Sequence, residues 1–156
     1  MQKIIKIVLV VLVCVSLGFL SGMVTRDSVT TWYPTLIKPF FNPPNWIFAP
    51  VWTLLYIMMG IAAGLVWTSD SDEKAIKKAL GFFVIQFGLN ALWSYIFFGL
   101  HNTMLALIEI IVLLLLIYDT YTAFKKIDKT AGMLLLPYLA WVGFATILNA
   151  SIWWLN

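Results

Sequence analysis

Five long apolar runs divide this chain, and they restrict its possible folds more than any other feature. A helix that crosses the hydrocarbon core of a membrane needs about 20 mostly apolar residues. Five such helices use most of the 156 residues and leave no room for a separate soluble domain. Only 11% of the residues are charged, whereas soluble domains carry roughly 25%. The sequence therefore predicts an all-α integral membrane protein, a single bundle of five transmembrane helices.

The spans are expected over about residues 4–25, 46–68, 75–99, 104–124 and 131–154. Lys3 and Lys6 precede the first run, and a basic start before an apolar stretch also describes a signal peptide. The uncharged run from Ile7 to Thr25 is longer than the core of a usual signal peptide, which has about 7–15 residues. Its length favours a transmembrane helix.

Four prolines fall between the first two spans: Pro34, Pro39, Pro43 and Pro44. Proline has no amide hydrogen and disfavours helical geometry in the residue before it. We therefore expect Trp32–Asn45 to be a stiff segment that is not helical. Arg26 and Asp27 are expected to end the first span, so that residues 26–45 form the first loop. Lipid cannot satisfy open backbone, so this loop lies at the membrane surface or folds over a cavity in the bundle. Its many aromatic residues fit a lid over a ligand site, and they also fit interfacial anchors.

The distribution of cations predicts the orientation. The N-terminus and the loops after the second and fourth helices hold eight lysines, whereas the opposite side holds only Arg26 and Lys38. The more basic side of a bacterial plasma membrane protein faces the cytoplasm. We therefore expect a cytoplasmic N-terminus, with the first loop and the C-terminus outside. The cations lie at helix ends rather than in one basic patch, which gives no sign of nucleic-acid binding.

Two helix faces carry polar, small or aromatic side chains at four-residue spacing: Gln86, Asn90 and Ser94 on the third helix, and Trp141, Ala145 and Asn149 on the fifth. Residues four apart share one face of a helix. Amides are costly in lipid, so the face on the third helix is expected to look into the bundle.

Aromatic residues from the first loop and three helices are candidates for the walls of a cavity: Tyr33, Trp52, Trp93 and Trp141. Together with Asn90, Ala145 and Asn149 they would give an apolar cavity with a few polar contacts, the usual composition of a small-molecule site. Flat aromatic faces suit a flat, conjugated ligand. The alternative is an ordinary aromatic core and interfacial belt.

Other kinds of chemistry have little support in the sequence. One histidine and one cysteine do not make a metal cluster, and we expect no metal site and no resident cofactor. His101 is either a lone axial ligand for a haem iron or a polar turn residue. Glu109 lies within a span, where an acid is a functional candidate. Its alternative is a structural acid packed against Gln86 or Asn90.

Three motifs carry a resemblance to a known family: W-Y-P-T-L-I-K-P-F-F-N-P-P-N-W-I-F-A-P-V-W-T-L-L-Y-I-M-M-G at 32–60, L-N-A-L-W-S-Y-I-F-F-G at 89–99, and P-Y-L-A-W-V-G-F-A-T-I-L-N at 137–149. The chain resembles bacterial members of the translocator protein family, also called tryptophan-rich sensory proteins or the peripheral-type benzodiazepine receptor family. The resemblance covers the whole chain from the first helix onward. It implies a five-helix bundle with a pocket closed by the first loop, and a homodimer.

The resemblance also implies ligands and site residues. The family binds porphyrins such as protoporphyrin IX, isoquinoline and benzodiazepine drugs and, in animals, cholesterol. Matched position by position, the pocket would contain Tyr33, Ala49, Trp52, Asn90, Trp93, Trp141, Ala145 and Leu148. Some bacterial members are reported to degrade porphyrins in light, with tryptophans implicated that match Trp52 and Trp141. The end of the fifth helix, N-A-S-I-W-W-L-N, lacks the Tyr–Arg cholesterol motif of animal members, so no specific cholesterol site is expected.

The leading functional prediction is therefore a receptor or transporter-like binder of porphyrins and other flat apolar molecules. One alternative is an enzyme that degrades porphyrin in light through Trp52 and Trp141, which would need no acid–base pair. Another is a regulatory membrane partner whose aromatic residues serve only in packing.

Overall fold

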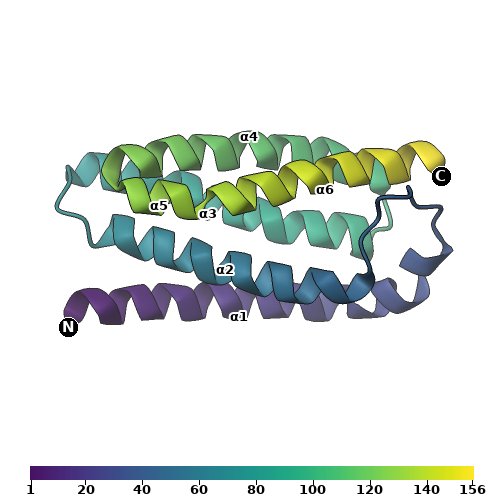
Figure 1. Ribbon diagram of the computed structural model, residues 1–156, viewed down its shortest axis with the longest axis horizontal. Helices are drawn as coiled ribbons and strands as arrows, with labels where there is room; N and C mark the ends of the chain where they lie inside the picture. Colours follow the sequence, from purple (N-terminus) through teal and green to yellow (C-terminus); the bar gives the residue numbers. More distant parts are fainter.

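The computed structural model describes all 156 residues and consists of helices and their connections. Five helical segments are long and apolar enough to cross a membrane: Gln2–Thr31, Asn45–Trp67, Glu73–Gly99, Thr103–Ile127 and Lys129–Leu155. They run side by side, and the two ends of the chain lie at opposite ends of the bundle (Figure 1). The predicted all-α architecture with five spans is confirmed.

The first helix, α1 (Gln2–Thr31), is longer than predicted. Arg26 and Asp27 lie inside it, so the prediction that they end the span was wrong, as was the start of the loop at residue 26. Neither side chain prevents helical hydrogen bonding, and the amide of Trp32 still donates to the carbonyl of Ser28 at 3.0 Å. The helix ends only where Pro34 approaches, because proline restricts the residue before it.

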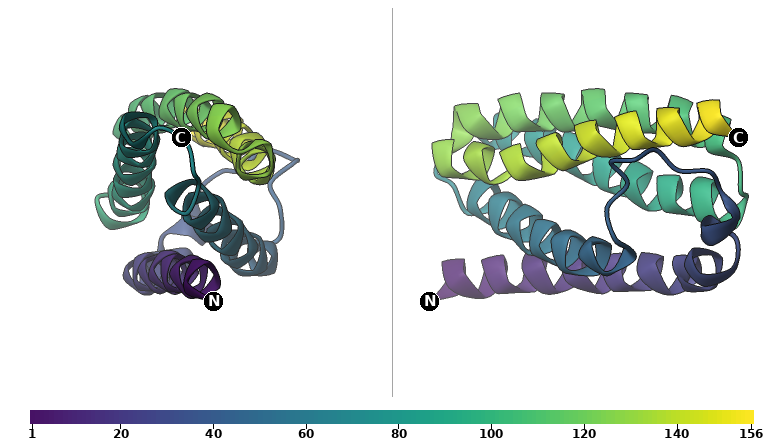
Figure 2. Two further views of the ribbon diagram at one scale, coloured as in Figure 1. Left: turned by 90° about the vertical axis from the view of Figure 1, so that its left-hand side faces the viewer. Right: turned by 45° about the vertical axis from the view of Figure 1, so that its right-hand side comes forward.

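The proline-rich segment between α1 and α2 (Asn45–Trp67) is shorter than predicted. It opens with a single 3₁₀ turn, η1 (Tyr33–Thr35), and then runs without regular structure to Pro44. We call residues 32–44 the lid. Two of the views show the lid crossing one end of the bundle, at the end where the C-terminus lies (Figures 1 and 2).

Helix α2 packs closely along α1 because glycines remove side-chain bulk from the contact. A Cβ atom placed on Gly60 would lie 2.5 Å from the Cα of Val11, and one on Gly64 would lie 2.8 Å from the Cα of Ile7. Small residues of this kind let the backbones of membrane helices approach each other.

The third span consists of α3 (Glu73–Ser94) and a π-helical turn, η2 (Tyr95–Gly99). The prediction of a regular α-helix to residue 99 was therefore wrong in its last turn. The amide of Leu100 donates to the carbonyl of Tyr95 at 2.9 Å, five residues back. Turns of this kind often occur at functional sites.

The predicted fifth helix, 131–154, is interrupted. The structure has a short α5 (Lys129–Leu134) and a longer α6 (Leu136–Leu155), with the break at Leu135. The cause is Pro137, whose ring clashes with the carbonyl four residues back and which has no amide to donate. Before α5, helix α4 (Thr103–Ile127) runs on through two lysines that were expected in a loop, and Asp128 alone connects the two helices.

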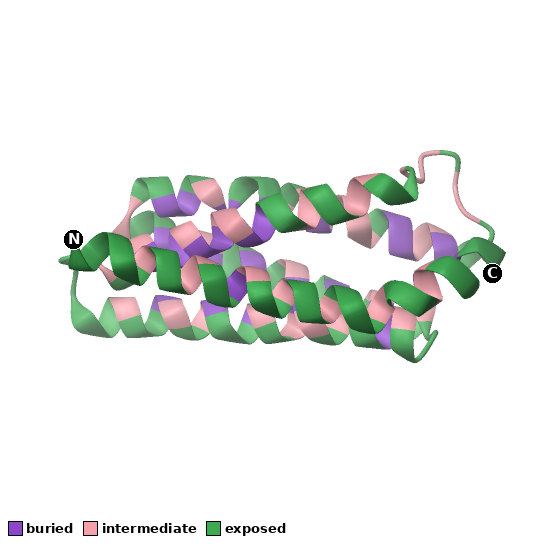
Figure 3. Ribbon diagram, turned by 90° about the horizontal axis from the view of Figure 1, so that it is seen from below, coloured by how far each residue is buried: buried purple, intermediate pink, exposed green.

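Buried residues form two groups, and the larger lies in the half of the bundle nearer the N-terminus (Figure 3). The second group joins Tyr33 of the lid to the residues below it, among them Phe97 and Ile152. Helix α1 contributes only Cys14 to the core, and its other large side chains are mostly exposed, as on a surface that faces lipid. The fold thus leaves α1 as an outer wall beside α2 (Figure 2).

Candidate ligand-binding site

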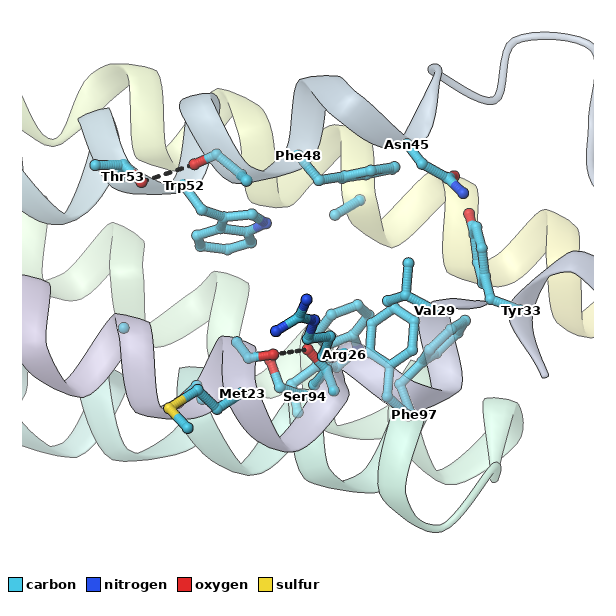
Figure 4. Close-up of a pocket in the computed structure, with 18 of the residues that line it drawn as sticks. Met23, Arg26, Val29, Tyr33, Asn45, Phe48, Trp52, Thr53, Ser94 and Phe97 are labelled. Carbon is cyan, nitrogen blue, oxygen red and sulfur yellow. Dashed lines mark hydrogen bonds between the residues drawn. The ribbon is translucent and has the colours of Figure 1, made fainter. Parts of the chain in front are cut away.

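A cavity of about 680 Å³ lies beneath the lid (Figure 4). Its walls come from α1, η1, α2, the end of α3 with η2, and α6. Most of the lining residues are hydrophobic. Both the volume and the composition are usual for a site that takes a small molecule, for which the range is about 300–1,000 Å³.

The structure brings seven of the eight predicted site residues to the wall of this cavity: Tyr33, Ala49, Trp52, Trp93, Trp141, Ala145 and Leu148. Asn149, predicted beside them, also lines it. Its side chain accepts a hydrogen bond from the indole nitrogen of Trp93 at 3.1 Å and donates to the carbonyl of Thr103 at 2.9 Å. These bonds fix the position of Trp93 against α4 and α6.

The eighth residue, Asn90, does not line the cavity, and this part of the prediction was wrong. Its carboxamide is buried in a polar network between α2, α3 and α6. It accepts from the Tyr56 hydroxyl at 2.8 Å and donates to the Tyr138 hydroxyl at 3.0 Å, which in turn donates to Gln86 at 2.7 Å. The polar face of α3 does look into the bundle, as predicted, and the Tyr56 ring separates Asn90 from the cavity.

Glu109 of α4 is buried, but neither of its carboxyl oxygens has a hydrogen-bond partner. The side-chain nitrogen of Gln86 also has none. One interpretation of this residue was a structural acid, protonated or hydrogen-bonded, packed against Gln86 or Asn90; Glu109 forms no hydrogen bond with either of them. Glu109 does not line the cavity.

Aromatic rings stack in pairs along the cavity wall. Trp52 lies against Tyr56 with ring centroids 5.6 Å apart, and Trp93 lies against Phe97 at 5.1 Å. Trp141, on α6, meets the edge of Phe48 at 6.1 Å. Each tryptophan ring is thus held in place by a neighbouring aromatic ring. The three tryptophans therefore present rigid, flat surfaces to the cavity.

Side chains hold the lid both internally and to the residue that follows α6. The Tyr33 hydroxyl donates to Asn42 at 2.8 Å, and the Lys38 ammonium lies 4.8 Å from the centre of the Tyr33 ring. Asn156, the last residue, accepts from the amide of Ile37 at 3.0 Å and donates to its carbonyl at 2.9 Å. Burial raises the pKa of Tyr33 to about 12, and the bond to Asn42 opposes this rise. The phenol is therefore neutral at physiological pH.

Comparison with known proteins assigns the chain to a family. Residues 10–155 match the TspO/MBR family. The chain belongs to this family. The tryptophan-rich protein TspO of Archaeoglobus fulgidus is 43% identical over 99% of both chains. The tryptophan-rich sensory protein of Cereibacter sphaeroides is 39% identical over 80% of this chain and 77% of its own length.

Animal relatives match as well. The translocator protein of Bos taurus is 36% identical over 87% of this chain and 81% of its own length. The resemblance predicted from three motifs is thus confirmed. Together with the five apolar helices, membership of the TspO/MBR family makes the chain an integral membrane protein.

Sequence reasoning missed one wall of the cavity in this TspO/MBR protein. Helix α1 lines it with one face, at spacings of three and four residues: Val15, Gly18, Gly22, Arg26, Val29 and Thr30 among others. The regular spacing was a usable signal, but the helix was expected to end at residue 25. Phe97 and Phe98 of η2 also line the cavity.

His101 lies outside the cavity lining, in the turn after η2, with a positive φ of 54°. Its ring stacks on Trp32 with centroids 4.2 Å apart, and its Nε2 atom is 3.1 Å from the Ser28 hydroxyl. These contacts fit the turn-residue interpretation and leave the haem-ligand interpretation without support from the geometry.

Proposed function

We propose that this protein binds porphyrins, such as protoporphyrin IX, and other flat apolar molecules in the cavity beneath the lid. The isoquinoline and benzodiazepine drugs belong to the same ligand class. The supporting observation is a cavity of about 680 Å³ that brings together Trp52, Trp93 and Trp141 from three helices. Membership of the TspO/MBR family supports a receptor or transporter-like role in a membrane.

The test is a titration of the purified protein with protoporphyrin IX in the dark. Quenching of tryptophan fluorescence and the shift of the porphyrin absorption band report binding. Trp52→Phe and Trp141→Phe each remove part of an aromatic surface on which the porphyrin would stack. A stacking contact contributes about 0.5–1.5 kcal/mol, so each variant should bind porphyrin roughly two- to twelvefold more weakly. Trp154→Phe is the matched control, because Trp154 is 77% exposed and does not line the cavity.

Saturable binding that weakens in both cavity variants, but not in the control, supports the proposal. Binding that never saturates and ignores these substitutions refutes it, because the porphyrin would then only partition into the detergent or lipid. In that case a regulatory membrane partner protein becomes the better account, and recovery of a stoichiometric partner would test it.

A second candidate function is light-dependent oxidation of a bound porphyrin by dioxygen. The observation that favours it is that Trp52 and Trp141, from α2 and α6, both line the cavity in which the porphyrin is proposed to bind. Loss of the porphyrin absorption band under illumination measures the reaction. A loss rate unchanged in Trp52→Phe and Trp141→Phe would exclude a role for these residues.

We also propose a placement in the cell and an assembly. The end of the bundle that holds eight lysines faces the cytoplasm of a bacterial plasma membrane, and the lid faces outward. Cysteine labelling from one side of the membrane at an introduced lid cysteine tests this orientation. The protein is proposed to form a homodimer, which cross-linking in native membranes tests.

A further inference from the structure

Arg26 is the one cation in the lining of the cavity. Figure 4 shows its guanidinium on the side of α1 that faces Trp52. The guanidinium makes no ion pair, since the sole salt bridge of the protein joins Lys77 to Glu73. It also donates no hydrogen bond to another residue, although the backbone carbonyl of Arg26 accepts one from Thr30.

The surroundings of Arg26 supply no internal anion. Asp27 is its chain neighbour, but it does not line the cavity and forms no ion pair. The polar residues that line the cavity on α6 and in the lid, Asn149 and Tyr33, already have hydrogen-bond partners of their own. The five guanidinium donors are thus available to a molecule that enters the cavity.

A guanidinium matches a carboxylate through two parallel hydrogen bonds, which are stronger than bonds between neutral groups. Arg26 is an exposed residue, so a carboxylate can reach its guanidinium while the apolar part of the ligand contacts the mostly hydrophobic walls. We propose that Arg26 recognises a carboxylate on an otherwise flat, apolar ligand. The cavity then selects amphipathic anions over neutral molecules of the same shape. This inference rests on the proposed function and names the ligand chemistry that the site prefers.

A matched pair of ligands tests the inference: protoporphyrin IX, which has two carboxylates, and its dimethyl ester, which has the same ring and no carboxylate. Arg26→Gln removes the charge and the fork of donors, and Arg26→Lys keeps the charge alone. Lys3→Gln removes one positive charge at the far end of the bundle and controls for net charge. Each protein is titrated in the dark in neutral detergent.

We expect Arg26→Gln to weaken binding of the dicarboxylate about tenfold, which corresponds to about 1.4 kcal/mol. Binding of the ester should change less than twofold in all variants, and Arg26→Lys should fall between wild type and Arg26→Gln. Lys3→Gln should match wild type. If Arg26→Gln leaves the dicarboxylate unaffected, or weakens both ligands equally, the inference is overturned. If neither ligand binds wild type, the proposed function itself fails.

The same anion chemistry exists in lipid headgroups, because an arginine near a helix end also contacts lipid phosphate. Repeating the titrations in nanodiscs of phosphatidylcholine and of phosphatidylglycerol separates the two sources. An unchanged ratio of wild-type to Arg26→Gln affinity in both supports recognition of the ligand carboxylate. A ratio that falls to one in phosphatidylglycerol shows that lipid phosphate occupies Arg26, and it overturns the inference.

Discussion

Replacing Gly60 by alanine should separate α1 from α2 and destabilise the bundle. The new Cβ atom would lie 2.5 Å from the Cα of Val11, whereas ordinary contact begins at 3.4 Å. The atom that blocks it belongs to the backbone, so α1 itself has to move. Overpacking of this kind costs about 1–3 kcal/mol, and alanine recovers up to about 1 kcal/mol of helix propensity.

Gly88→Ala is the matched control, because a Cβ atom there meets nothing within 4 Å. Gly88→Ala gains the same helix propensity as Gly60→Ala but has no steric clash. The free energies of unfolding of the two variants should therefore differ by about 1–3 kcal/mol. For a chain of this length 1 kcal/mol shifts the unfolding temperature by roughly 2–4 °C. Thermal unfolding in one detergent compares the two proteins directly. Equal unfolding temperatures for the two variants would refute the close α1–α2 contact.

Two further predictions concern the buried polar network between α2, α3 and α6 and the lid of the cavity. Tyr138→Phe leaves Asn90 and Gln86 each with an unpartnered group, so it should lower the free energy of unfolding by about 1–3 kcal/mol. Tyr56→Phe breaks only one hydrogen bond and should lower the free energy of unfolding less. Thermal unfolding compares the two variants. The pKa of Tyr33 is raised from 10.0 to about 12, so the stability that its neutral phenol contributes is complete below pH 10 and is lost as the pH rises towards 12. The unfolding temperature of wild type should fall more steeply over this range than that of Tyr33→Phe, and parallel curves would contradict the prediction.

The five transmembrane helices could be predicted from the lengths of the apolar runs alone, because the thickness of a membrane fixes how many apolar residues a spanning helix needs. The inward face of α3 followed from the cost of amides in lipid, and Gln86 and Asn90 are indeed buried. The sequence did not predict that Asn90 would be buried away from the cavity. Spacing along a helix gives the direction in which a side chain points, but Tyr56 of another helix decides whether it reaches the cavity.

The end of α1 was misplaced because charged residues were taken as a boundary. Arg26 and Asp27 are compatible with a helix, and only Pro34 restricts the backbone enough to end it. The π turn at Tyr95–Gly99 had no signal in the sequence. Its Phe98 carbonyl accepts a hydrogen bond from Ser28 on α1, a contact between segments 70 residues apart.

The pair of hydrogen bonds between Asn156 and the backbone of Ile37 has a practical consequence for protein engineering. Asn156 directly follows α6, and its side chain fastens the middle of the lid. An affinity tag or fluorescent fusion joined after Asn156 would place a flexible polymer beside the cover of the cavity. The N-terminus lies at the other end of the bundle (Figure 1). Tags for binding measurements therefore belong before Met1.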